Sequence, residues 1–114
     1  MPNQSHSIEN TFAALADPTR RAVVQRLSQG AATVTQLASP FTMALPSFTQ
    51  HLGILERAGL IVSQKRGRSR ICTLNPHALR EAEDWMASSR RSWEDRLDRF
   101  EAHLAQTQKD EDNE

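Results

Sequence analysis

Apolar residues in the first half of the chain recur every three or four positions, as on one face of an amphipathic helix. Ile8, Phe12 and Leu15 have this spacing and predict a first helix. An Asp-Pro pair at residues 17–18 favours the start of a second helix, because Asp caps helix N-termini and Pro fits the first position. This helix is expected to run to about residue 29, where Gly30 stops it.

Two further helices are predicted before residue 60. Residues 33–36 have the sequence Thr-Val-Thr-Gln, the spacing of a capping box, and start a short third helix that Pro40 ends. A fourth helix begins near residue 45, and Gly59 is placed to end it with a left-handed cap. Its expected core stripe has spacings of three, four and three, at Leu45, Phe48, Leu52 and Leu55.

The next segment predicts a basic β-hairpin. Strands over 61–65 and 68–74 flank an Arg66-Gly67 turn, where glycine permits a positive φ. Four basic residues cluster there with no acid nearby in the sequence, and phosphate groups would neutralise them: Lys65, Arg66, Arg68 and Arg70. A helix followed by a basic hairpin is typical of a winged helix-turn-helix, so we expect a mainly α fold with a small β-hairpin that binds double-stranded DNA.

The exposed face of the fourth helix supplies the candidate base-reading residues. It carries small and amide side chains in place of Lys/Glu pairs, and Ser, Thr and Gln can donate and accept hydrogen bonds in the major groove. Taken alone, this face fits a plain solvated surface equally well, and the basic hairpin decides in favour of DNA. The candidates on this helix are Ser47, Thr49, Gln50 and His51.

A last helix is predicted from Asn75-Pro76 to about Gln106, with a heptad-like apolar stripe. Thirty residues of helix span about 45 Å, whereas a domain of this size has a radius of gyration of about 13 Å. A second copy of the chain would cover the stripe, and the helix can also bend back over the first helix; we expect some of both. The predicted homodimer contact contains Trp85, Met86, Trp93, Leu97 and Phe100.

A chain of 114 residues fits one domain. We expect that domain over residues 8–106, between a disordered N-terminus at 1–7 and a disordered acidic tail at 107–114. The start lacks the features of a signal peptide, and no apolar run is long enough for a membrane. A single cysteine excludes an intrachain disulfide and fits a reducing cytoplasm. The net charge is zero, yet residues 18–80 carry +8 and residues 81–114 carry −6, which suggests two surfaces with different roles.

The segments FAALADPTRRAVVQRL, VTQLASPFTMALPSFTQHLGILERAGLI and GRSRICTLNPHAL, with the tryptophan-containing tail, resemble the ArsR family of bacterial winged-helix repressors. The resemblance implies that Ser47, Thr49, Gln50 and His51 read operator DNA. It also implies that the wing touches the backbone or minor groove through Arg66, Gly67, Arg68 and Arg70. Dimers in that family form through the first and last helices, which adds Phe12 to the expected interface. The chain departs from the family pattern at Ala44, where a capping Ser is common, and at Gly53, where a basic residue is common.

Many members of that family sense metals, but the third helix here, VTQLASPF, has no cysteine, and no late His/carboxylate pair has ligand spacing. We therefore expect no metal, no cofactor and no enzyme activity, and we expect Cys72 to be a buried packing residue. The leading interpretation is a dimeric repressor on an inverted-repeat operator. The alternatives are a winged-helix module for protein partners and a metal-responsive repressor with an atypical site.

Overall fold

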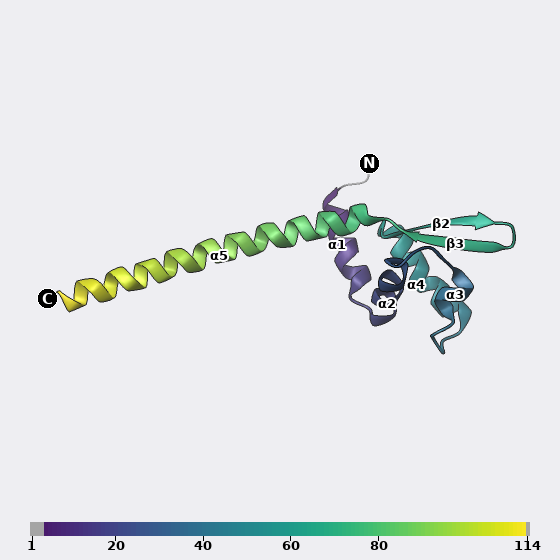
Figure 1. The fold of residues 1–114 in the computed structure, drawn as a ribbon, viewed down its shortest axis with the longest axis horizontal. Coiled ribbons are helices and arrows are strands. Elements are labelled where there is room, and N and C mark those ends of the chain that lie inside the picture. The colour runs from purple at the N-terminus through teal and green to yellow at the C-terminus, as the bar shows by residue number, and fades with distance from the viewer. Residues whose placement is uncertain (1–3, 114) are drawn as a thin grey trace. The chain divides into compact units, whose positions relative to one another are not determined.

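The computed structural model describes residues 4–113, with side chains from Ile8 onward, and consists of five helices and a small sheet within that range (Figure 1). The elements in chain order are α1 Gln4–Leu15, α2 Pro18–Leu27, β1 Ala32–Thr33, α3 Val34–Ala38, α4 Leu45–Arg57, β2 Ile61–Arg66, β3 Ser69–Leu74 and α5 Pro76–Asp112. The chain divides into two compact units within α5, the first ending at Ala82 and the second beginning at Glu83. Among the described helices, none is long and apolar enough to cross a membrane.

Side-chain caps fix the starts of α2 and α3. The carboxylate of Asp17 accepts a hydrogen bond from the backbone N–H of Arg20 at 3.1 Å, which satisfies a donor that has no partner inside α2. The predicted capping box of α3 is confirmed. The Thr33 hydroxyl accepts from the Gln36 N–H at 3.1 Å, and the Gln36 side chain accepts from the Thr33 N–H at 2.9 Å.

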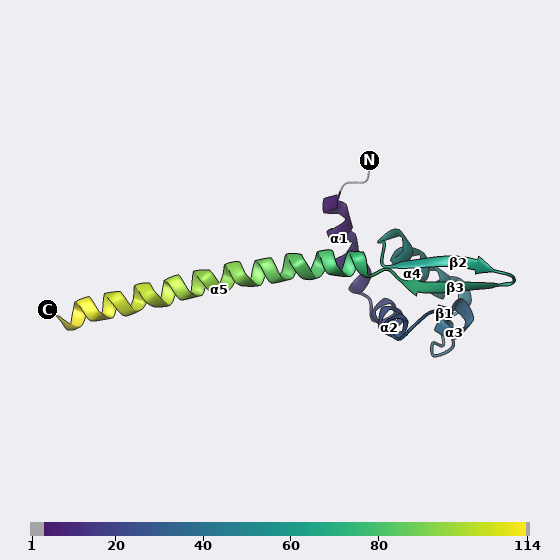
Figure 2. The same cartoon turned by 45° about the horizontal axis from the view of Figure 1, so that its top comes forward.

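The sheet has three antiparallel strands in the order β1-β3-β2 (Figure 2). The hairpin was predicted, but its two-residue turn is Gly67-Arg68 and not Arg66-Gly67, since Arg66 still pairs with Ser69. Gly67 has a φ of +61° and Arg68 is not at positive φ, so glycine occupies the first turn position, as a type II′ turn requires. Strand β1 was not predicted, because two residues beside a capping box show no alternation.

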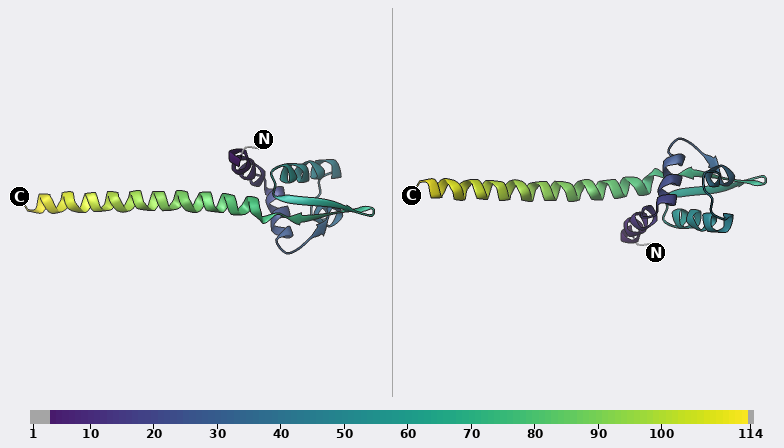
Figure 3. Two further views of the ribbon diagram at one scale, coloured as in Figure 1. Left: turned by 90° about the horizontal axis from the view of Figure 1, so that it is seen from above. Right: turned by 90° about the horizontal axis from the view of Figure 1, so that it is seen from below.

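The core of the first unit lies between α4, α2 and the sheet. Phe48, Leu52 and Leu55 are buried on α4, which packs against both α2 and β2 and runs beside the hairpin (Figure 3). The predicted stripe is wrong at Leu45, whose side chain is 57% exposed. Leu45 is the first residue of α4, a turn short of the part that the core covers. The left-handed cap at Gly59 is confirmed by its φ of +79°.

The terminal helices extend further than the sequence indicates. Helix α1 begins at Gln4, within the segment expected to be disordered, and α5 continues to Asp112, so the predicted helix end at Gln106 is wrong. The side chain of Gln106 donates to Asp110 at 3.1 Å, one turn later, and such i,i+4 pairs support a helix even in a polar sequence. The division into domains stays a prediction.

Candidate nucleic-acid interface

The exposed face of α4 carries three of the four predicted base-reading residues. Ser47, Thr49 and Gln50 are all exposed. The Thr49 hydroxyl donates to the Leu45 carbonyl at 2.9 Å, so its oxygen lone pairs stay open to accept from outside the helix. Ala44 provides no side-chain cap at the start of α4, as the departure at this position implied. These side chains together form a polar, uncharged surface with donors and acceptors.

Arg57 adds a cation to this face, which the sequence analysis did not select. A Cβ on Gly53 would lie 3.2 Å from an Arg57 guanidinium nitrogen, so the Arg57 side chain folds back along α4 over the glycine. The two residues line an open groove together with Leu45, Pro46, Thr49 and Gln50. Arg57, one turn later, thus supplies the positive charge that Gly53 lacks. The i,i+4 spacing of Gly53 and Arg57 was the available signal.

His51, the fourth predicted base-reading residue, lies differently. Its side chain is only 22% exposed, and Nδ1 lies 3.1 Å from an Arg20 guanidinium nitrogen and 3.6 Å from the Asp17 carboxylate. Arg20 also donates to the carbonyls of Ala14, at 2.7 Å, and Ala13, at 3.3 Å. His51 therefore belongs to a link that joins α4 to the end of α1 and the start of α2.

Asp17 is the acid of this link. The backbone N–H of Arg20 lowers the pKa of the Asp17 carboxyl below its ordinary value of 3.8, and the nearby charges of His51 and Arg20 lower it further against the opposing effect of burial. An ionised Asp17 both caps α2 and faces the ring of His51. The orientation of α4 relative to α2 therefore depends on polar contacts as well as on the apolar core.

The wing, defined as residues 61–74, carries three exposed cations toward its tip. Lys65, Arg66 and Arg68 form no side-chain hydrogen bond or ion pair within the part of the chain that the structure describes. Their positive charge is uncompensated, and an external polyanion would satisfy it. Three of the four predicted wing cations thus lie free in solvent beside α4.

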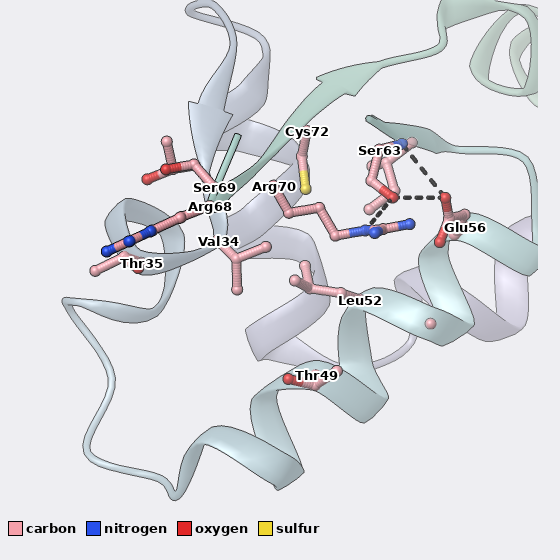
Figure 4. Close-up of a pocket in the computed structure, with 13 residues that line it drawn as sticks. Val34, Thr35, Thr49, Leu52, Glu56, Ser63, Arg68, Ser69, Arg70 and Cys72 are labelled. Atoms are coloured by element: carbon pink, nitrogen blue, oxygen red, sulfur yellow. Dashed lines mark hydrogen bonds between the residues drawn. The ribbon is translucent and has the colours of Figure 1, made fainter. Parts of the chain in front are cut away.

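Arg70 departs from the prediction that no acid lies near the basic cluster. Its Nε donates to the Ser63 hydroxyl at 3.0 Å, and that hydroxyl donates to the Glu56 carboxylate at 2.8 Å (Figure 4). The cause is the strand register, which pairs Ser63 with Cys72 and so places Ser63 diagonally across from Arg70. Glu56 is close in space although it is 14 positions away in sequence.

Cys72 is a buried free thiol, which confirms its predicted place in the core. Burial raises the pKa of the thiol, and the negative charge of Glu56 raises it further against the effect of Arg70. A thiol held neutral is a poor nucleophile and metal ligand. Among the described residues, no three His, Cys, Asp or Glu side chains are grouped so that they could hold a metal ion.

In the second unit, α5 presents the predicted apolar stripe on its surface. Trp93 is 63% exposed and Phe100 is 58% exposed, and Met86, Leu97 and Leu104 are each about half exposed. Trp85 on α5 and, in the first unit, Phe12 on α1 are also exposed. An apolar stripe of this length is unusual for a surface that faces only water.

Comparisons with known proteins agree with this geometry. A family profile described as a helix-turn-helix domain matches residues 15–64. The transcriptional repressor SdpR of Bacillus subtilis is 34% identical over 79 residues, which cover 69% of this chain and 88% of SdpR. The HTH-type transcriptional regulator Rv2034 of Mycobacterium tuberculosis is 38% identical over 73 residues, covering 64% of this chain and 68% of that protein.

Solved structures show the same fold. The crystal structure of the ArsR family transcriptional regulator RHA00566 has a TM-score of 0.77 and 47% sequence identity, and the match covers 82% of this chain and 97% of that one. The crystal structure of a possible transcriptional regulator for arsenical resistance has a TM-score of 0.62 and 38% identity, over 67% of this chain and 79% of that one.

Proposed function

Because the chain belongs to the ArsR family of DNA-binding winged helix-turn-helix transcriptional regulators, we propose that it represses transcription by binding an inverted-repeat operator as a homodimer. The observation that carries this proposal is the exposed polar face of α4 beside the uncompensated cations of the wing. A regulator of this kind acts where the bacterial chromosome lies, which places it in the cytoplasm.

Helix α4 and the wing contact different parts of the DNA. Ser47, Thr49 and Gln50 face base edges in the major groove, where hydroxyl and amide groups discriminate between base pairs. Lys65, Arg66 and Arg68 contact phosphates or a narrow minor groove and supply affinity that does not depend on sequence. Arg70 and Arg57 border the same surface and add positive charge to it.

His51 has a supporting role in this proposal. Its ring is engaged by Arg20 and Asp17, so it fixes α4 against α2 and does not extend to a base. Base-reading helices need such support, because a shift of about 1 Å misaligns hydrogen bonds with the bases.

The dimer forms through the stripe on α5. Trp93, Leu97 and Phe100 are large apolar side chains more than half exposed on one chain, and a symmetric partner would cover the same residues on both copies. The family resemblance adds α1, with Phe12, to that interface. Two symmetric copies place two recognition helices on DNA half-sites about 10 base pairs apart or a multiple of that distance.

Two other functions have less support. A winged helix that binds a protein partner is disfavoured because the free cations of the wing form one uncompensated cluster, which a polyanion such as DNA matches. We do not propose a metal-responsive repressor, because α3 carries no cysteine and the single cysteine, Cys72, is buried with a raised pKa.

Selection of DNA from a random pool tests this function. We expect the purified full-length protein to enrich one inverted repeat, and Gln50→Ala to lose that enrichment while it still retains DNA at low salt. A protein that enriches no sequence and retains no DNA at low salt would contradict the proposal and favour a protein partner.

A further inference from the structure

A groove lies between α4 and the wing in the first unit. It has a volume of about 360 Å³, and the beginning of α3 closes one side of it (Figure 4). Ligand pockets range from about 300 to 1,000 Å³, so this groove has room for one small molecule.

The floor of the groove is apolar. Val34, Leu52, Ile61 and Cys72 line it, and the Cys72 sulfur points from β3 into the groove (Figure 4). Because the thiol has a raised pKa, it stays neutral and behaves as part of the apolar floor. An apolar group of a ligand would be buried on this floor.

Arginine gives the groove its net charge. Arg68 and Arg70 line it with a single acid, Glu56. The Glu56 carboxylate already accepts from the hydroxyl and the backbone N–H of Ser63, at 2.8 and 3.3 Å. Arg70 has only Nε engaged, and Arg68 has no side-chain partner among the described residues, so guanidinium N–H groups remain available. A carboxylate matches the fork of a guanidinium group.

We propose that the groove between α4 and the wing binds a small amphipathic carboxylate, its apolar body on the Leu52–Cys72 floor and its carboxylate on Arg70, with Arg68 at the rim. A bare phosphate or a DNA backbone phosphate would gain nothing from the apolar floor. The volume corresponds to that of about a dozen water molecules, which suits a monocarboxylate with one or two aromatic rings or a medium-length chain.

Binding there would release DNA. Thr49, Arg68 and Arg70 line the groove and also border the DNA-contacting surface, so a bound carboxylate would neutralise cations that phosphates otherwise engage. The binding site stands on the groove alone, whereas this consequence rests on the proposed function.

Nuclear magnetic resonance of the isotope-labelled full-length protein without DNA tests the site. The probes are benzoate, octanoate and 2-naphthoate up to about 10 mM, a range that detects millimolar dissociation constants, beside their neutral amides and sodium phosphate at equal ionic strength. We expect at least one carboxylate to shift the amide signals of Leu52 and Cys72 saturably, and its amide to bind about tenfold more weakly.

Two arginine variants form a matched pair for this test. Arg70→Gln should lower carboxylate affinity about tenfold, to the level of the amide. Arg66→Gln removes another exposed wing cation that does not line the groove and should leave that affinity unchanged. The carboxylate should then weaken DNA binding by wild type and by Arg66→Gln, but much less by Arg70→Gln.

Three results would overturn the site: no saturable shift with any of the three carboxylates, the same shifts with phosphate alone, or an equal loss of affinity in both variants. If the protein bound no DNA at all, the proposed function would fail, and the measurements without DNA would still decide whether the site exists.

Discussion

Asp17 stands where the ends of two helices meet the recognition helix α4. Its carboxylate caps α2 through the Arg20 N–H and lies 3.6 Å from the His51 ring, so one side chain serves both local structure and the placement of α4. Because the pKa of the Asp17 carboxyl is lowered in the folded protein, ionised Asp17 stabilises the fold at pH values above its ordinary pKa of 3.8. That contribution is lost as the pH falls below 3.8 through the lowered pKa.

Asp17→Ala should reduce the free energy of unfolding by about 1 kcal/mol at pH 7, because the cap is lost. Asp17→Asn keeps a capping acceptor without the charge, so it should cost less at pH 7. The difference between wild type and Asp17→Asn should shrink as the pH falls below 3.8, because the carboxyl is then protonated first in the unfolded chain and, at its lowered pKa, in the folded protein. Urea titrations of the three proteins at pH 7 and pH 3 measure these differences. A difference between wild type and Asp17→Asn that does not change with pH would show that charge plays no part.

Gly53 is a second residue whose replacement tests a local contribution to stability. Gly53→Ala should stabilise the fold by about 0.5–1 kcal/mol, since glycine inside a helix is unfavourable. The new Cβ would meet only the flexible end of Arg57 at 3.2 Å, which can move away. Thermal unfolding checks the sign. A lower melting temperature would show that α4 is stabilised by the Arg57 side chain where it lies against Gly53.

At this scale, local periodicity predicted some site residues and not others. It placed Ser47 and Gln50 opposite the core stripe of α4 and Thr49 on the flank, and all three are exposed. The inward contacts of His51 depend on Arg20, 31 positions earlier, and no local pattern indicates that pairing. The contact of Arg70 with Ser63 likewise depends on the strand register.

Among the elements, the short helix α3 depends most on its cap. It has five residues, too few for a stable helix by propensity alone, so the reciprocal hydrogen bonds of Thr33 and Gln36 carry much of its definition. Thr33 also pairs with Ile71 in the sheet, which ties α3 to the wing.

Thr33→Ala should therefore destabilise the protein by about 1 kcal/mol through loss of the cap. Thr33→Ser keeps the hydroxyl and is the matched control, with a much smaller expected cost. Chemical denaturation of both variants gives the comparison. Equal losses in the two would assign the effect to the Thr33 methyl group and not to its hydroxyl.

Element boundaries were predictable where a residue type enforces them. The Asp17-Pro18 start of α2 and the cap at Gly59 follow from the chemistry of single residues. Strand β1 is too short for a pattern, and the end of α5 lies in a polar stretch where no residue type stops a helix. Strand β1 depends on its pairing with β3, and the end of α5 depends on how far the helix continues; local sequence patterns show neither.

At the scale of the whole molecule, the surface of α5 requires a partner in the proposed function. Replacing Trp93 and Leu97 by Glu should convert dimers to monomers. Operator binding should then weaken strongly, because a monomer binds one half-site at a time, whereas a dimer binds both with two linked domains. Arg96→Glu changes charge beside the stripe without removing an apolar side chain and should remain dimeric. Sedimentation at micromolar concentration distinguishes the species. A monomeric wild type would contradict the dimer.

The most direct test of DNA reading by α4 and the wing is a salt series of binding affinities for wild type, Gln50→Ala and Arg68→Ala on operator and on random DNA. Arg68→Ala should weaken both DNAs alike and lower the log–log salt slope by about one, since one phosphate contact is lost. Gln50→Ala should cost about 1–3 kcal/mol on the operator and little on random DNA. Equal weakening of both DNAs by both variants would contradict the division between α4 and the wing, and no change with either variant would contradict DNA binding through this surface.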